Sequence, residues 1–294
     1  MNKGTYPSRR IFLALDYFFF LLIILVCLYP FWYIFISSVS GSSGDAGAFL
    51  PRSFTLENYS KVMGMEGVFN ALVISILRTL VGTALTVISA MFLGYLFTKE
   101  KMPFRKFLYR ALMITMYVSG GLVPTYLAIR HYGLLDNFWV YILPSMVSAY
   151  YIILVKTFVE QLPSSVEESA MLDGAGTLTI FFRIIIPMSM PIVATIAVFS
   201  GVGHWNSWFD NHLYTFRSRN LTTLQYMLYN YLNQVEILVK QMNELGRDMG
   251  IDKIITPKGV RMTVTMVTVT PVLFIYPFLQ RYFVKGIMLG AVKG

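Results

Sequence analysis

Three groups of residues in this sequence could recognise or couple to another molecule. The first is a single arginine, Arg78, inside a long apolar stretch that begins near Val68. A charge at such a depth in a membrane needs a partner, because hydrocarbon does not solvate it. Two interpretations follow: Arg78 binds the carboxylate of an acidic ligand, or it bonds to helix-end carbonyls or to a partner protein.

The second group lies at the end of another apolar stretch and combines aromatic with polar side chains. It consists of Trp205, Asn206, Trp208 and Asp210. Aromatic faces beside polar groups suit sugar rings, but Trp and Tyr also gather at membrane interfaces without any ligand. Both interpretations stay open, and we treat this group and Arg78 as candidates for a substrate path.

The third group is a polar segment between two apolar stretches. Pro163 is expected to start a helix that Ser164 or Ser165 caps, with acidic residues in its first turn. Glycines then end or turn this helix, and a second short helix runs to Pro187. The prediction is a compact helix–turn–helix, although an amphipathic connector would share its periodicity. The residues that carry this pattern are Glu167, Glu168, Gly174, Gly176, Ile180, Phe181 and Ile184.

The composition places these groups in a membrane protein. The chain is 56% hydrophobic and only 13% charged, whereas soluble domains carry about 25% charge. A helix needs about 20 mostly apolar residues to cross the hydrocarbon core. We therefore predict an all-α integral membrane protein with six transmembrane helices. The charge-free stretches are 17–44, 79–98, 111–129, 137–155, 184–209 and 262–280, with the second helix starting near Val68.

The basic residues predict the orientation of these helices. They flank the stretches so that both termini lie in the cytoplasm. The segment 159–187 is then cytoplasmic and 207–261 is external, with an amphipathic helix at 220–235. The chain divides into an N-terminal region, 1–67, a core, 68–285, and a C-terminal tail, 286–294. The first stretch is too long for a signal peptide and is expected to be retained.

Several classes of function are not expected. The net charge of +9 is distributed around apolar stretches, which does not indicate nucleic-acid binding. Cys27 is the single cysteine, and the histidines at 131, 204 and 212 form no ligand pattern, so no metal site is expected. The chain also lacks the Gly-x-x-x-x-Gly-Lys-Ser/Thr loop that binds nucleotide phosphates. We therefore expect no enzymatic activity and no cofactor in this chain.

The polar segment resembles the EAA loop of ABC importer permeases. It matches that pattern at Glu168, Ala170, Asp173, Gly174, Ala175, Phe181, Ile184 and Pro187, and departs from it at Ser169, where alanine is usual. The resemblance implies that the first helix docks on an ATP-binding subunit, which holds ATP and Mg. The coupling residues would be Glu168, Ser169, Ala170, Asp173, Gly174, Ala175 and Pro187.

Other motifs resemble the maltose-type carbohydrate importer permeases, near the branch for complex or acidic polysaccharide fragments. They include Gly121-Leu122-Val123-Pro124 and Gly133-Leu134-Leu135-Asp136. The resemblance implies a type I importer fold in the bacterial inner membrane and an oligosaccharide substrate. The implied partners are a second related permease, two ATP-binding subunits and an external solute-binding protein that contacts the segment 207–261. A peptide or amino acid importer is the alternative.

Overall fold

The computed structural model describes residues 7–41, 49–51, 53–233 and 259–274, and regular structure within these ranges is helical. The one strand-like contact there is a bridge between Ser40 and Phe54. The all-α class is confirmed for the described residues. The chain divides into two compact units, Met1–Met65 with Asn230–Val269, and Glu66–Tyr229 with Thr270–Gly294.

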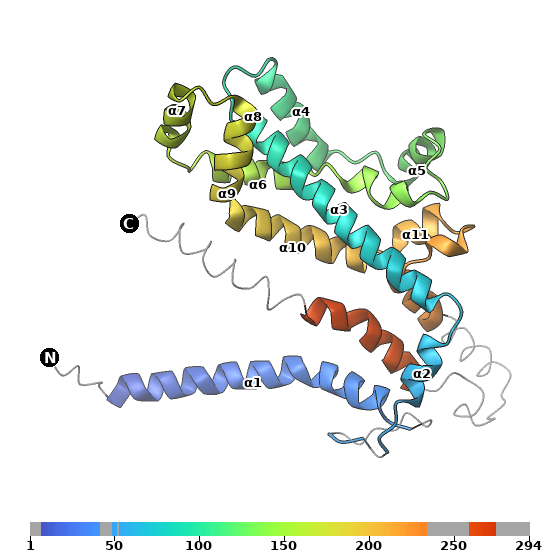
Figure 1. Ribbon diagram of the computed structural model, residues 1–294. Helices are drawn as coiled ribbons and strands as arrows, with labels where there is room; N and C mark the ends of the chain where they lie inside the picture. Colours follow the sequence, from blue (N-terminus) through green and yellow to red (C-terminus); the bar gives the residue numbers. More distant parts are fainter. Residues whose placement is uncertain (1–6, 42–48, 52, 234–258, 275–294) are drawn as a thin grey trace. The chain divides into compact units, whose positions relative to one another are not determined.

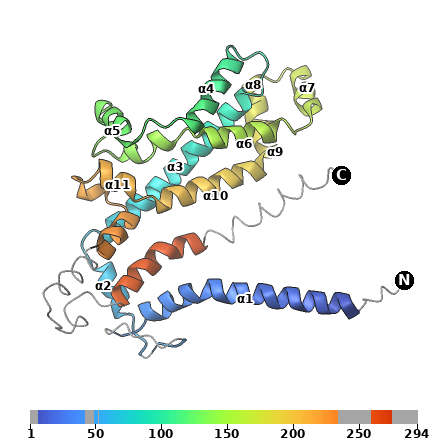
Figure 2. The same cartoon turned by 180° about the vertical axis from the view of Figure 1, so that it is seen from behind.

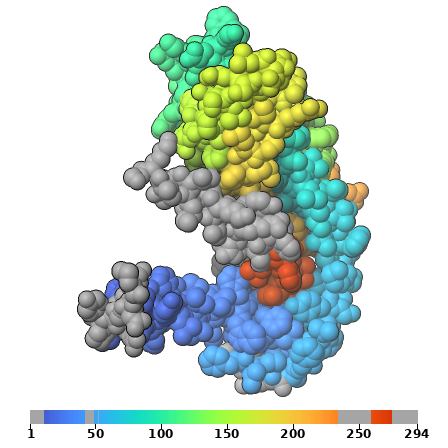
Figure 3. Space-filling model, turned by 60° about the vertical axis from the view of Figure 1, so that its left-hand side comes forward, coloured from blue at the N-terminus to red at the C-terminus, as the bar shows by residue number. Residues whose placement is uncertain are grey.

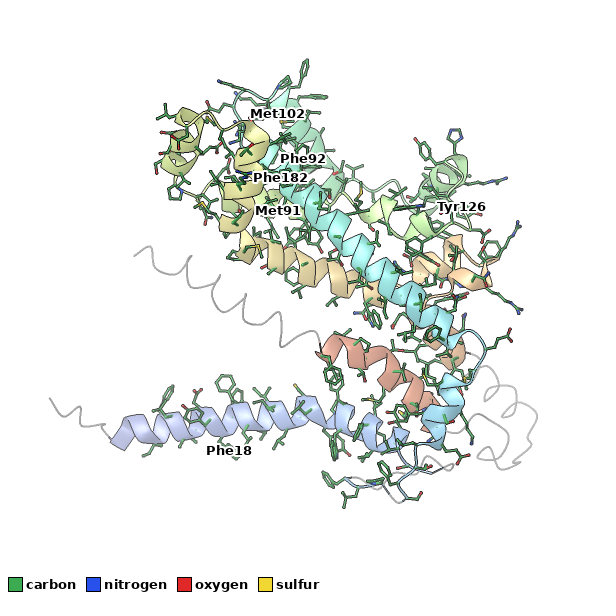
Figure 4. The ribbon with its side chains drawn as sticks, viewed as in Figure 1. Phe18, Met91, Phe92, Met102, Tyr126 and Phe182 are labelled. Carbon is green, nitrogen blue, oxygen red and sulfur yellow. The ribbon has the colours of Figure 1, made fainter. Side chains whose placement is uncertain are left out.

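The first unit contains α1 (Pro7–Ser38), a long helix with almost no packed face (Figure 1). Its stretch Ile11–Ser38 is long and apolar enough to cross a membrane. The large apolar side chains along it are exposed, and Phe18, which projects from the helix in Figure 4, is 64% exposed. A surface of this kind needs lipid or another chain to cover it.

The end of α1 is held by buried polar side chains from the rest of this unit. Asn58 of α2 (Glu57–Met63) is 1% exposed, and its Nδ2 donates to the carbonyls of Ser38 (3.1 Å) and Ser40 (2.8 Å). Thr263, in the helix Gly259–Phe274, donates to the same Ser38 carbonyl at 3.2 Å. These bonds satisfy carbonyls at the helix end that no helical N–H reaches.

We expect Asn58→Ala to destabilise this unit. The variant leaves two buried carbonyls with fewer donors, and each unsatisfied group costs about 1–3 kcal/mol. The measurement is the apparent melting temperature of the purified protein in detergent. Asn70→Ala is the matched control, because the Asn70 side chain donates to the Asn220 carbonyl (2.7 Å) at an exposed position. Equal shifts in the two variants would contradict the role given to Asn58.

The second unit is organised around α3 (Val68–Leu96), which begins at Val68 as predicted. Its buried residues recur every three or four positions, and several are small. A Cβ on Gly82 would lie 2.6 Å from the His204 ring in α10 (Met190–Asn206). A Cβ on Gly94 would lie 2.6 Å from Val155 in α6 (Ala149–Val159). The glycines therefore allow α6 and α10 to approach α3 closely.

The remaining elements of this unit lie along α3, as the opposite views of Figures 1 and 2 show. The elements α4, α7 and α8 are at its C-terminal end, where Met91, Phe92, Met102 and Phe182 gather in Figure 4. Besides α3, α6 and α10, the helical elements of this unit are α4 (Arg105–Tyr117), α5 (Leu122–His131), η1 (Phe138–Tyr141), η2 (Leu143–Ser145), α7 (Ser164–Leu172), α8 (Thr177–Ile180), η3 (Phe181–Ile185), α9 (Ile186–Met188), α11 (Phe209–Tyr214) and η4 (Arg219–Leu221). A further helix covers 224–233, within the helix predicted at 220–235.

The stretch 111–129 is not one continuous helix. The helix α4 ends at Tyr117, Val118 is extended (φ −112°, ψ 115°), and α5 starts only at Leu122. Gly121 has a φ of 81°, in the region that glycine adopts without strain. The helical path that apolar composition alone suggested therefore ends at Tyr117, and the chain passes through glycines 120 and 121 before α5 begins.

Two other stretches are bent. The segment Thr177–Met188 meets α10 at 78°, and Phe138–Ser145 meets α6 at 48°. At the first bend Pro187 and Pro191 flank Ser189, and proline lacks the N–H that a continuous helix requires. Among the described residues, two helices are long and apolar enough to cross a membrane, and up to four spans result if each bent pair is one span. Residues 275–280 of the last stretch lie outside the described residues.

Candidate functional site

The loop between α6 and α8 forms the predicted helix–turn–helix. Its first helix, α7, begins after Pro163, and no side chain caps it, so the predicted Ser164 or Ser165 cap is wrong. The Ala175 N–H bonds to the Ala170 carbonyl (2.9 Å), and the Gly174 N–H bonds to that of Met171 (3.0 Å). This pair of bonds is the Schellman motif, which needs a left-handed residue at Gly174 (φ 80°).

The two adjacent glutamates of α7 have different environments. Glu167 is partly buried, forms an ion pair with Lys99, and accepts a hydrogen bond from the Tyr95 hydroxyl (3.0 Å). Lys99 Nζ also lies 4.1 Å from the centroid of the Tyr95 ring. Glu167 thus anchors α7 to the C-terminal end of α3. Glu168 is exposed, and no ion pair or hydrogen bond joins its side chain to another described residue.

The outer face of α7 is apolar as well as acidic. Leu172 is 89% exposed and Met171 is 51% exposed, beside the exposed Glu168 and Asp173. The space-filling view shows the yellow-green segment around α7 at the surface (Figure 3). Two exposed apolar side chains and two exposed carboxylates therefore lie close together in sequence on α7 and just after it. The structure thus brings together Glu168, Ser169, Asp173 and Gly174 on one exposed element.

The other predicted coupling residues face inward or lie further along the chain. Ala170 and Ala175 pack against the core that contains the buried Ile180 and Phe181. The Phe181 ring stacks on Tyr95, with centroids 5.3 Å apart. Pro187 lies in α9, and the second helical segment ends at Met188, one residue beyond the predicted end. The side chains that fix α7 therefore come from α3, from Lys99 just after it, and from η3.

Arg78 has its partners within this chain. Its guanidinium forms an ion pair with Asp210, including an Nη1–Oδ1 contact of 3.1 Å, and Nη1 donates to the Ser207 carbonyl at 3.0 Å. The Arg78 Cζ also lies 4.7 Å from the centroid of the Tyr141 ring. Arg78 itself is 2% exposed. A cation at the C-terminal end of α10 is also favoured by the helix dipole.

The chain that follows α10 is fixed by buried polar groups. Asn211 accepts from the Thr223 N–H (2.7 Å) and donates to the Thr215 hydroxyl (2.6 Å). The Tyr141 hydroxyl bonds to Thr215 (2.6 Å) and donates to the Leu221 carbonyl (2.7 Å). Asp210 itself accepts hydrogen bonds from the Ser207 hydroxyl (3.0 Å) and from the Asn211 N–H (2.9 Å), so both it and the segment after it are held in place.

The aromatic members of the candidate substrate path are separated by the fold. Trp205 is buried, at 7% exposed, whereas Asn206 is exposed. The Trp208 ring stacks on Tyr229 with centroids 3.8 Å apart and planes inclined by 15°. One face of Trp208 is therefore already covered by an aromatic ring, which leaves less of it for a ligand.

Arg78 and Asp210, both candidates for the substrate path, border a cavity of about 310 Å³. Its walls include Thr86 of α3, Ser148 before α6, and Ser200 and His204 of α10. The sequence did carry a signal for the α3 side of this cavity, because Arg78, Gly82 and Thr86 follow one another at four-residue spacing and so lie on one helix face. Among the described residues, no group of three His, Cys, Asp or Glu side chains could hold a metal ion.

Comparisons with known proteins match nearly the whole chain. The family described as "Binding-protein-dependent transport system inner membrane component" matches residues 90–289. A polygalacturonan/rhamnogalacturonan transport system permease protein of Bacillus subtilis is 33% identical over 290 residues, which cover 98% of this chain and 100% of that protein. An arabinooligosaccharides transport system permease protein of Halalkalibacterium halodurans is 23% identical, with 100% of both chains covered. A solved bacterial ABC transporter involved in import of the acidic polysaccharide alginate matches with a TM-score of 0.81 and 25% identity, covering 96% of this chain and 100% of that one.

Proposed function

The chain belongs to the family of inner membrane components of binding-protein-dependent transport systems, and from this membership we propose that it is the permease subunit of an ATP-driven oligosaccharide importer. The observation that carries the substrate class is the full-length similarity to permeases named for polygalacturonan, rhamnogalacturonan and arabino-oligosaccharides. Members of this family are membrane subunits and not enzymes. The similarity to these sugar permeases favours a sugar over the alternative of a peptide or amino acid.

The exposed helix α7 is the proposed contact with the ATP-binding subunit. Its apolar residues and Glu168 are exposed, while Glu167 fixes the helix to α3. A helix held in this way would transmit a displacement to α3, because its anchor is the ion pair of Glu167 with Lys99 and the hydrogen bond that Glu167 accepts from Tyr95. ATP and Mg would be bound by the partner subunits, and closure of those subunits would move α7.

The proposed topology has six spans with both termini in the cytoplasm, and α7 on the same side. The permease core then covers 68–285, between the N-terminal region 1–67 and the tail 286–294. The proposed assembly contains a second related permease, two ATP-binding subunits and an external solute-binding protein. The segment 207–261 is the proposed contact with the binding protein, although 234–258 lie outside the described residues.

Reconstitution tests this function. We expect proteoliposomes with the purified complex and its binding protein to take up labelled galacturonate or arabinose oligosaccharides only when ATP is present. A labelled peptide of similar mass is the control substrate, and omission of the binding protein is the control for dependence. Uptake of the peptide but of neither sugar would contradict the proposed substrate class. The chain purified alone should hydrolyse no ATP.

A further inference from the structure

The cavity beside Arg78 contains polar groups that the chain itself does not satisfy. Thr86 is 1% exposed, and its hydroxyl has no hydrogen-bond partner among the described residues. Threonines in helices usually return the hydroxyl to a carbonyl of the preceding turn. Thr79 and Thr195 do so, at 2.7 and 2.9 Å. The Nε of Arg78 is also buried without a partner within the described ranges. Unsatisfied groups of this kind in a cavity wall point to a ligand.

The charges of the cavity are already neutralised. Both terminal nitrogens of Arg78 are engaged by Asp210 and the Ser207 carbonyl. The ring of His204 hydrogen-bonds to the backbone of Gly82. A carboxylate entering the cavity would lose its hydration and meet the Asp210 carboxylate. The guanidinium charge of Arg78 is already compensated by Asp210, although its Nε–H has no acceptor among the described residues and remains free to donate. The cavity therefore suits an uncharged ligand better than an acidic one.

The remaining walls suit a ring with hydroxyl groups on its edge. Tyr151 and Phe199 supply aromatic surface, and Ser148 and Ser200 supply further hydroxyls. Ligand pockets commonly combine apolar walls with a few polar groups, in volumes of about 300–1,000 Å³. The cavity, at about 310 Å³, is at the small end of that range and fits one ring of a longer chain.

We propose that this cavity is a subsite for one uncharged sugar ring, in which Thr86 and the Arg78 Nε bind ring hydroxyls. The proposal rests on the proposed import of oligosaccharides and goes beyond it by naming the site and its charge preference. Arg78 forms part of the subsite wall, but its ion pair with Asp210 has no net charge, so Arg78 does not select for acidic sugars.

The test is direct binding to the purified complex in detergent, without the solute-binding protein. The probes are a labelled arabinose trisaccharide, which is neutral, and a labelled galacturonate trisaccharide. We expect the neutral probe to bind more tightly, and Thr86→Val to weaken its binding by about 5- to 10-fold, the loss of one hydrogen bond. The melting temperature of this variant should not fall, because valine keeps the volume and removes an unpaired hydroxyl.

Thr83→Val is the matched control. The Thr83 hydroxyl is likewise buried without a partner in the described residues, one turn away, but Thr83 does not line the cavity. Gly203→Leu is a second variant that should abolish binding, since Gly203 lines the cavity and has open space where a Cβ would lie. Equal binding by wild type, Thr86→Val and Gly203→Leu, tighter binding of the acidic probe, or no binding of either probe would overturn the subsite. Cavity-dependent binding in a complex that takes up no sugar would instead overturn the proposed function.

Discussion

Arg78→Met and Asp210→Asn are each expected to destabilise the protein strongly. The two native residues form an ion pair in which the side chain of Arg78 is 3% exposed and that of Asp210 is 20% exposed. Removal of one partner from a buried pair costs about 3–5 kcal/mol, because the other charge is left without compensation. We therefore expect a low yield of assembled complex and a clear fall in its melting temperature for both variants.

The double variant shows how much of the lost stability comes from leaving one charge unpaired. Because neither charge remains, Arg78→Met with Asp210→Asn should lose less stability than the sum of the single variants. Lys61→Met is the control, since Lys61 pairs with Glu57 at 2.7 Å on an exposed helix face, 45% and 58% exposed. Such surface pairs contribute about 0–1 kcal/mol. If Arg78→Met instead assembles normally and loses only the transport of acidic sugars, Arg78 binds the substrate and the ion pair is dispensable.

Glu168→Lys is expected to abolish transport and the stimulation of ATPase activity by the loaded binding protein. Glu168 is exposed on α7, and we propose that it pairs with a basic residue of the ATP-binding subunit. Reversal of its charge would replace an attraction by a repulsion at that contact, which changes the interaction free energy by about 2–5 kcal/mol. We therefore expect the transport rate to fall more than about tenfold. Glu100→Lys is the control, because Glu100 is also exposed and acidic but lies outside α7. Normal stimulation in the Glu168 variant would contradict its role.

A second pair of variants tests the geometry of α7 rather than its charge. The left-handed conformation of Gly174 (φ 80°) ends the helix, and no atom lies within 4 Å of an added Cβ. A substitution there is limited by backbone strain alone. We expect Gly174→Val to lose coupling like Glu168→Lys, whereas Gly174→Asn should keep most of it, since asparagine tolerates this conformation. Equal activity of the two variants would show that the turn does not determine coupling.

Several features of this protein were determined by its sequence alone. The apolar stretches predicted an all-helical membrane protein, and the start of α3 at Val68 is confirmed. The glycine at 174 predicted the turn after α7, because few other residues adopt a left-handed backbone without strain. The pattern from Glu168 to Pro187 indicated the family to which the chain belongs. These features depend on composition and local conformation, which a single segment of chain encodes.

Only the tertiary structure decided the partners of the charged residues. Arg78 of α3 and Asp210 of α11 are 132 positions apart, and they meet because α10, which precedes α11, packs against α3. Glu167 and Glu168 are neighbours of the same type, yet only Glu167 reaches Lys99 and Tyr95. Apolar composition likewise could not show that the stretch 111–129 is interrupted before α5. The periodicity of a sequence specifies which side of a helix is apolar. Charge pairs and cavity walls form where separate helices meet, so both depend on how the helices pack.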